Sequence, residues 1–268
     1  MRLTVLGGSA AGGNPGQPCS GYLAESGETR IALDLGTATL QQLREHTDAA
    51  LLDGIVISHM HLDHVLDLLA MRYFLAYSPG ASGRRAPLWL PPGGLAFLDR
   101  LALALEDDGE GDPYFAVFDA REYDPARQLT AGVLTISFAP TVHYVPTWAM
   151  RVSDGVSSLT YTADTGPAAN LEGFAAGTDL LIAEGSCDEP GDEPRETRGH
   201  LMPEEAGELA ARSSAKALLL THLWQQYGLE RAARRAANRY AGPVFLAQPG
   251  LSIDLGGPGG PPHAVEPA

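Results

Sequence analysis

The segment Ser58–His64 constrains this chain most, because it places three histidines and one aspartate within six positions. The apolar run Gly54–Ser58 predicts a buried strand just before it, and apolar residues at helical spacing predict a helix over Leu62–Ala76. Imidazole nitrogens and carboxylate oxygens are the ligands that zinc and similar divalent ions prefer. Such groups crowd together only at high cost unless a cation binds them. The segment therefore predicts a metal site at the end of a buried strand.

Three further polar residues stand just beyond the ends of expected strands: His143, Asp164 and His222. Taken singly, each is more often a capping or turn residue than a ligand. Taken together with the histidine cluster, they supply enough ligands for a second coordination shell. The sequence therefore predicts that several strand ends meet at one site.

The remaining pattern predicts one α+β domain over residues 1–255, because strands and then helices occur in each half and no linker separates the halves. The other expected strands are Met1–Gly7, Tyr22–Ala24, Arg30–Leu35, Pro87–Leu90, Tyr114–Phe118, Val133–Ala139, Thr147–Val152, Ser158–Thr162, Asp179–Ala183, Ala217–Leu220 and Val244–Ala247. The other expected helices are Gln41–His46, capped by Thr37, Pro203–Ser213 and Leu229–Tyr240. Residues 256–268 are rich in Gly and Pro, so we expect a flexible tail.

The order of these residues resembles the metallo-β-lactamase superfamily over nearly the whole chain. The resemblance implies an αββα sandwich of two mixed sheets with helices on the outer faces and a dinuclear metal site. It assigns His59, His61 and His143 to one metal, Asp63, His64 and His222 to the second, and Asp164 to a bridge between them. Asp164 stands where some true β-lactamases carry cysteine, and Cys187 occupies no ligand position. The resemblance therefore argues against antibiotic hydrolysis.

Gly199–Ala206 places His200 just before an expected helix, which resembles the ribonuclease Z-like and small phosphodiesterase branch of that superfamily. Leu6–Ser9 and Asp34 resemble the same branch. The branch implies a hydroxide between two metals that attacks phosphorus, with Asp63 orienting it and His200 protonating the leaving oxygen. The alternative for His200 is a neighbour of a helix cap without chemistry.

Charge favours a small substrate. The chain carries 18 basic and 33 acidic residues, a net charge of −15, which opposes binding of a nucleic-acid backbone. Tyr77–Asp112 contains no extended basic arm of the kind with which ribonuclease Z grips tRNA, and it ends in the acidic run Glu106–Asp112. We therefore expect small phosphodiesters, with cyclic nucleotides first. The alternatives are ribonuclease Z-like RNA processing, hydrolysis of thioesters, lactones or sulfate esters on the same metal site, and a metal-binding protein without activity.

The sequence also bears on the ions, the compartment and assembly. Zinc is the first expectation for the two divalent ions, and manganese or iron fit the same ligands. Neither a secretory leader nor an apolar run long enough to cross a membrane is visible, and the cysteines are few, so we expect a cytoplasmic protein. Relatives in this superfamily commonly pair, which suggests a homodimer.

Several residues keep two interpretations. Asp67 would either hold a ligand imidazole or face solvent. The loop Gly7–Gly16 resembles a phosphate-binding loop, but we expect it to lie at the rim of the site. Four aromatic residues flank the strand-end histidines: Tyr144, Trp148, Trp224 and Tyr227. Aromatic side chains fill cores more often than they wall pockets, so we expect core packing. Four arginines share a helix face that would be an anion patch or, as we favour, solvated surface or a subunit contact: Arg231, Arg234, Arg235 and Arg239.

Overall fold

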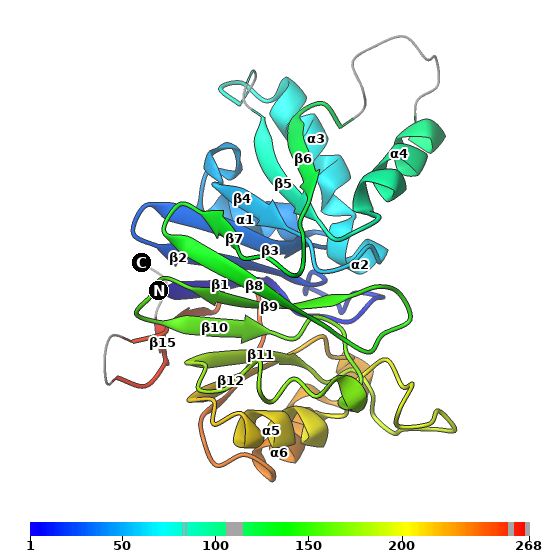
Figure 1. Cartoon of the computed structure of the whole chain (residues 1–268), viewed down its shortest axis with the longest axis vertical. Helices are drawn as coiled ribbons and strands as arrows, with labels where there is room; N and C mark the ends of the chain where they lie inside the picture. Colours follow the sequence, from blue (N-terminus) through cyan, green and yellow to red (C-terminus); the bar gives the residue numbers. More distant parts are fainter. Residues whose placement is uncertain (82, 84, 106–114, 257–259, 266–268) are drawn as a thin grey trace.

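Two β-sheets face each other in the computed structural model, with helices against their outer faces (Figure 1). The structure describes residues 1–81, 83, 85–105, 115–256 and 260–265. This arrangement of two mixed sheets confirms the expected α+β sandwich. The largest cluster of buried apolar side chains lies between the sheets, and a further cluster lies under the helices on each outer face.

The first sheet is eight-stranded in the described residues, in the order β15-β14-β1-β2-β3-β4-β5-β6. Its strands are β1 (Arg2–Gly7), β2 (Gly21–Ser26), β3 (Thr29–Leu35), β4 (Gly54–Val56), β5 (Ala86–Leu90), β6 (Phe118–Glu122), β14 (Ser252–Asp254) and β15 (His263–Val265). Strands β3 to β6 pair in parallel, whereas β1, β2, β14 and β15 pair antiparallel. The parallel half places the carboxyl ends of β3 and β4 at the same edge.

The second sheet is seven-stranded in the described part of the chain, in the order β13-β12-β11-β10-β9-β8-β7. Its strands are β7 (Leu129–Ala131), β8 (Leu134–Pro140), β9 (Trp148–Ser153), β10 (Ser158–Tyr161), β11 (Leu180–Glu184), β12 (Ala217–Thr221) and β13 (Val244–Leu246). Strands β10 to β13 pair in parallel, and β11 and β12 are buried on both faces, which explains why they are apolar almost throughout.

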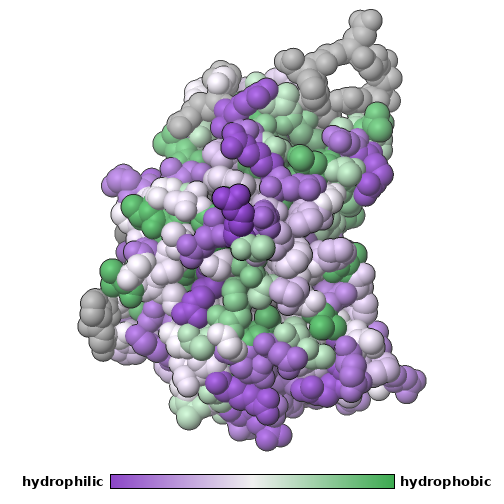
Figure 2. Space-filling model, in the orientation of Figure 1, coloured by the Kyte–Doolittle hydropathy of each residue, from purple (hydrophilic) through white to green (hydrophobic). Residues whose placement is uncertain are grey.

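Helices cover the outer faces. They are α1 (Thr39–His46), α2 (Leu62–Val65), α3 (Asp67–Tyr77), α4 (Gly94–Leu105), α5 (Pro203–Arg212) and α6 (Leu229–Ala237), with short 3-10 turns η1 (Ala49–Leu51), η2 (Pro167–Ala169) and η3 (Gln225–Tyr227). Helix α5 begins with a proline, which has no N–H to satisfy, and the Met202 N–H just before it donates to Glu205 Oε2 at 2.9 Å. Figure 2 shows hydrophilic side chains gathered over the end of the molecule that carries α5 and α6.

The structure corrects several local expectations. The expected helix Leu62–Ala76 divides into α2 and α3 at Leu66. Ala38, with φ of 68°, rather than Thr37 precedes α1. Of the strand expected over Tyr114–Phe118, Tyr114 lies outside the described residues, and β6 begins at Phe118.

Other differences concern α4, which the sequence analysis did not predict, and the last residues. Residues 256–268, which we expected to be a flexible tail, contain β15, and this strand pairs antiparallel with β14. The acidic run Glu106–Asp112 lies outside the described residues. No helix in the described residues is long and apolar enough to cross a membrane.

Candidate active site

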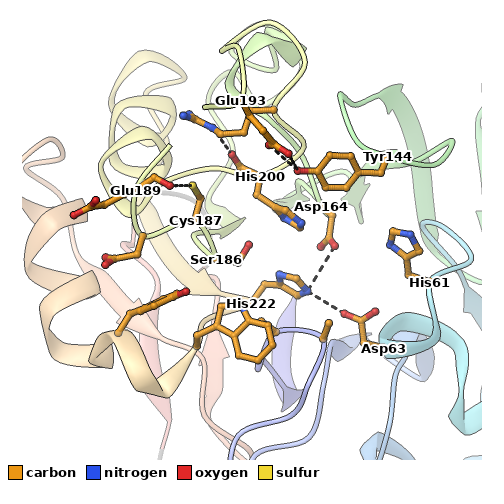
Figure 3. Close-up of a pocket in the computed structure, with 16 residues that line it drawn as sticks. His61, Asp63, Tyr144, Asp164, Ser186, Cys187, Glu189, Glu193, His200 and His222 are labelled. Carbon is orange, nitrogen blue, oxygen red and sulfur yellow. Dashed lines mark hydrogen bonds and ion pairs between the residues drawn. The ribbon is translucent and has the colours of Figure 1, made fainter. Parts of the chain in front are cut away.

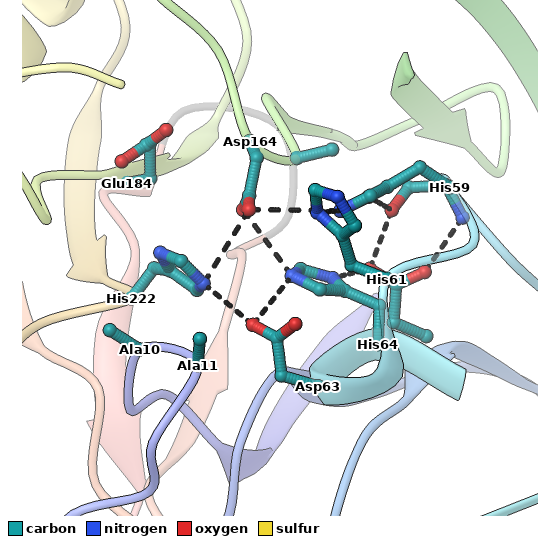
Figure 4. A network of polar contacts seen from close by, with 12 residues as sticks. Ala10, Ala11, His59, His61, Asp63, His64, Asp164, Glu184 and His222 are labelled. Carbon is teal, nitrogen blue, oxygen red and sulfur yellow. Dashed lines mark hydrogen bonds and ion pairs between the residues drawn. The ribbon is translucent and has the colours of Figure 1, made fainter. Parts of the chain in front are cut away.

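The predicted ligand residues meet at one edge of the two sheets (Figure 4). The Ser58–His64 segment follows β4, whereas His143, Asp164 and His222 follow β8, β10 and β12. Ala163 and His222 adopt left-handed backbone conformations, with φ of 52° and 54°. Non-glycine residues pay for such conformations, and they are common where a chain must turn sharply to aim a functional side chain.

The first group of possible metal ligands consists of His59, His61, His143 and Asp164. His61 Nδ1 lies 3.2 Å from His59 Nε2 and 3.1 Å from His143 Nε2. Asp164 Oδ2 lies 3.7 Å from His59 Nε2 and 3.6 Å from His143 Nε2. Tetrahedral zinc with bonds of about 2.0–2.1 Å separates its ligand atoms by about 3.3 Å. The four atoms are therefore spaced as one ion requires.

The second group consists of Asp63, His64, Asp164 and His222. Asp63 Oδ2 lies 3.1 Å from His222 Nε2 and 3.4 Å from His64 Nε2. Asp164 Oδ1 lies 3.3 Å from His64 Nε2, and Asp164 Oδ2 lies 3.6 Å from His222 Nε2. Asp164 thus belongs to both groups, which is the position that the resemblance assigned to a bridging ligand.

Hydrogen bonds fix which ring nitrogens can bind an ion. His64 Nδ1 faces Asp34 Oδ2 at 2.7 Å, and His143 Nδ1 faces the Gly199 carbonyl oxygen at 2.9 Å. Both partners only accept hydrogen bonds, so each Nδ1 must carry the proton. The Nε2 atoms of these two rings therefore direct their lone pairs into the metal groups.

Both groups fit a cation better than any arrangement of protons. His61 Nδ1 can donate to His59 Nε2 or to His143 Nε2, but not to both, so the lone pair of one of these Nε2 atoms is left without a proton. In the second group, His64 Nε2 and Asp164 Oδ1 are buried atoms without a hydrogen-bond partner among the described residues. Buried polar atoms left in this way are costly, and a shared divalent ion would satisfy them.

The electrostatics of the groups agree with this donor set. Burial lowers the pKa of His59, His61 and His143, which keeps these rings neutral as ligands. Burial also disfavours a charged His64, but the negative charges of Asp164 and Asp34 outweigh it and raise the pKa of His64 well above its ordinary value. The carboxylates of the second group therefore favour a positive charge beside them, on either a proton or a metal ion.

Asp34, rather than Asp67, binds the imidazole of a possible metal ligand, His64. Asp34 is buried at the end of β3, with φ of 57°, and contacts His64 as described above. Asp67 is also buried, but its carboxylate accepts from the backbone N–H groups of Ala38 at 3.0 Å and Leu40 at 2.7 Å. Both interpretations offered for Asp67 are therefore wrong: it caps the beginning of α1.

His200 faces both groups from the opposite wall (Figure 3). Its ring centroid lies 4.9 Å from that of His143 and 5.8 Å from that of His222. Its Nδ1 lies 2.8 Å from Glu184 Oε1. Burial opposes the charged ring, but the charge and hydrogen bond of Glu184 raise the pKa of His200 to about 9. The sequence analysis missed Glu184, although it is a polar residue at the end of a strand like the others.

A cavity of about 570 Å³ opens over the metal groups. Tyr144, Trp224 and Tyr227 line it, so the expectation of core packing is wrong for these three, whereas Trp148 packs against the core between the sheets. Ala10 also lines it, as expected for a rim loop over Gly7–Gly16.

The loop between β11 and α5 forms the outer wall of this cavity and carries Asp188, Glu189 and Glu193. Arg231 Nη1 and the Arg235 guanidinium both bind Asp188 Oδ1, and Arg235 Nε also lies 2.6 Å from Glu204 Oε1. These two arginines therefore fasten the loop to α6. The predictions of an anion patch and of a solvated surface are therefore wrong for Arg231 and Arg235, which pair with carboxylates of the chain itself.

Comparisons with known proteins agree with the site. The sequence model of the beta-lactamase superfamily domain matches residues 29–223. YhfI of Bacillus subtilis, described as a probable metallo-hydrolase, is 32% identical over 256 residues, which cover 94% of this chain and 98% of the relative. The chain belongs to the metallo-β-lactamase superfamily. A ribonuclease Z of Mycolicibacterium paratuberculosis is 28% identical over 278 residues, covering 92% of this chain and 95% of that enzyme.

Solved structures place the chain in the same superfamily. The crystal structure of YhfI matches with a TM-score of 0.80 and 28% identity over 94% of this chain and 98% of the other. A diphosphatase from the PhnP family matches with a TM-score of 0.74 and 19% identity, over 94% and 97% respectively, which shows a shared fold. The resemblance deduced from the residues is confirmed. The protein is a metallo-hydrolase of this superfamily, a class that uses divalent ions.

Proposed function

We propose that the protein is a phosphodiesterase for small phosphodiesters such as cyclic nucleotides, with His200 as the general acid. The position of His200 carries the proposal. The Nδ1 atom of His200 is held by Glu184, and the ring points into the cavity beside both metal groups. A proton on its other nitrogen would therefore lie on the substrate side, where a leaving oxygen needs it.

The metal groups would be occupied by two divalent ions, of which zinc is the first candidate and manganese or iron the alternatives. When bound, such ions activate water and neutralise charge on phosphate oxygens. His59, His61, His143 and Asp164 would hold one ion, and Asp63, His64, His222 and Asp164 the other. Asp63 would in addition orient the attacking water.

The cavity wall supports a substrate of low negative charge. Glu189 and Glu193 line the wall. Among the described residues, the one arginine that lines the cavity is Arg198. It is buried and binds Glu205 and the His200 carbonyl oxygen, so it is not free to bind phosphate. A polyanion such as RNA would meet uncompensated carboxylates at this wall. The aromatic rings of Tyr144 and Trp224 offer stacking surfaces for a base.

Leaving-group dependence tests the role of His200. The metal-loaded protein and His200→Ala are compared on bis(p-nitrophenyl) phosphate and on a 3′,5′-cyclic nucleotide. An alkoxide needs a proton to leave, whereas nitrophenolate does not. We expect a loss of about 100- to 10,000-fold in kcat on the cyclic nucleotide and a much smaller loss on the nitrophenyl ester.

The exposed His263 on β15 provides the matched control, and His263→Ala should retain full activity. Equal losses on both substrates would exclude proton donation by His200. Turnover of thioesters or lactones by fully metallated protein, without phosphodiester turnover, would exclude the phosphodiesterase itself. Cleavage of precursor tRNA without turnover of small phosphodiesters would favour RNA processing instead.

A further inference from the structure

The buried carboxylate of Asp34 contacts His64 on the ring nitrogen that faces away from the metal groups. Asp34 Oδ2 lies 2.7 Å from His64 Nδ1, and it accepts hydrogen bonds from the Ser58 hydroxyl at 2.7 Å and the Tyr161 hydroxyl at 2.8 Å. Asp34 Oδ1 accepts from the Ser58 backbone N–H at 2.7 Å. Asp34, Ser58 and His64 are fully buried. Water therefore does not compete for these contacts, and the carboxylate is held rigidly.

The Ser58 hydroxyl extends this contact to a second imidazole. A serine hydroxyl has one proton, and here that proton is donated to Asp34 Oδ2. Towards His59 Nδ1, which lies 3.0 Å away, the same oxygen can therefore only accept. His59 must carry its proton on Nδ1, and its Nε2 lone pair is left for the first metal group.

We propose that Ser58 is a positioning residue that links the two metal groups through Asp34. Asp34 orients an imidazole of the second group, His64, directly. It orients an imidazole of the first group, His59, through the Ser58 hydroxyl. This inference rests on the metal groups of the proposed function, but not on the substrate.

Outer hydrogen bonds of this kind fix the tautomer and orientation of a ligand imidazole, and losing one typically costs about 10- to 100-fold in metal affinity. Without the hydroxyl, the His59 ring has no partner for its Nδ1–H, so the other tautomer and other ring angles become accessible. His64 keeps its direct bond to Asp34. The loss should therefore fall on the first group alone.

The test measures metal affinity separately in each group. Zinc is titrated into metal-free protein against a competing chelator. In a His222→Ala background the first group remains complete, and in a His143→Ala background the second group remains complete. We expect Ser58→Ala to weaken zinc binding about 10- to 100-fold in the first background and by less than about threefold in the second.

Two further variants separate positioning from packing. Tyr161→Phe removes a hydrogen bond to the same Asp34 oxygen but leaves the link from Ser58 to His59 intact, so it should not reproduce the selective loss. Ser58→Thr keeps the hydroxyl and should restore most of the affinity.

The outcomes are distinct. Unchanged affinity in Ser58→Ala, or equal losses in both backgrounds, would overturn the role of Ser58 and leave the proposed function standing. A wild-type chain that binds no divalent ion would overturn both. Binding with the expected selectivity, but without phosphodiester turnover, would overturn only the proposed function.

Discussion

Glu184 Oε1 lies 2.8 Å from His200 Nδ1 and also 2.8 Å from the backbone nitrogen of Thr165, directly after Asp164, which both metal groups share. Its other oxygen accepts from the Ser186 hydroxyl at 2.7 Å. One carboxylate at the end of β11 therefore orients the proposed general acid and fixes the chain that follows Asp164.

Replacing Glu184 by glutamine should shift the pH dependence of turnover. The negative charge of Glu184 raises the pKa of His200 against the effect of burial, so its removal lowers that pKa. A general acid is active in its protonated form, and activity falls as pH rises through its pKa. The alkaline limb of kcat on a cyclic nucleotide should therefore move to lower pH in Glu184→Gln. An alkaline limb in the same place would show that Glu184 does not tune His200.

Removing one charge from the cavity wall should improve binding of an anionic substrate. Tyr144 donates its hydroxyl to Glu193 at 2.8 Å, and glutamine can still accept that bond. Glu193→Gln should therefore lower the KM for a cyclic nucleotide, with a larger effect at low ionic strength because salt screens exposed charges. Glu196→Gln, in the same loop but outside the cavity lining, is the control. An equal effect of both variants would point to net charge alone.

Loosening the cavity wall should weaken substrate binding. Arg235 joins Asp188 of the loop to Glu204 of α5 and is mostly buried. Charge-assisted bonds of this kind contribute about 1.5–3 kcal/mol. Arg235→Gln should raise KM several-fold and increase proteolytic cleavage between α5 and β11. Arg239→Gln, just beyond the end of α6 and with its Nε 3.6 Å from Glu208 Oε1, should change neither. Equal behaviour of the two variants would contradict the fastening role.

Asp67 should matter for folding and not for metal binding. It caps α1 through two backbone N–H groups, so Asp67→Ala should lower the free energy of unfolding by about 1–2 kcal/mol. Urea unfolding of metal-free protein measures this effect. Zinc affinity should remain that of the wild type, in contrast to Asp34→Asn. A large loss of zinc affinity in Asp67→Ala would restore the first interpretation of this residue.

The proposed ligand residues were accessible to sequence analysis because they follow recognisable strands. His143 and His222 needed only the rule that polar residues beyond strand ends meet at one edge of a sheet. The same rule does not tell whether Asp34 or Asp67 binds a histidine of the site. The partner of Asp34 is 30 positions away in the chain and that of Asp67 is 27 positions away. Which of them reaches an imidazole depends on how β3, α1 and α2 pack.

The cavity wall was harder to predict for the same reason. Tyr144 and Trp148 lie four residues apart beside the same histidine, yet one lines the cavity and the other packs against the core. Arg235 binds Asp188 across 47 positions. The helix α4 was missed because the Pro- and Gly-rich segment before it indicates a loop.

The most direct test of the account is hydrolysis of a 3′,5′-cyclic nucleotide by the wild-type protein before and after metal removal. The protein is stripped with a chelator, divided, and restored with zinc or manganese, and phosphorus NMR follows the substrate. The account predicts that a phosphomonoester appears with the restored protein and not with the stripped protein. A fully metallated protein that leaves the phosphodiester intact would contradict it.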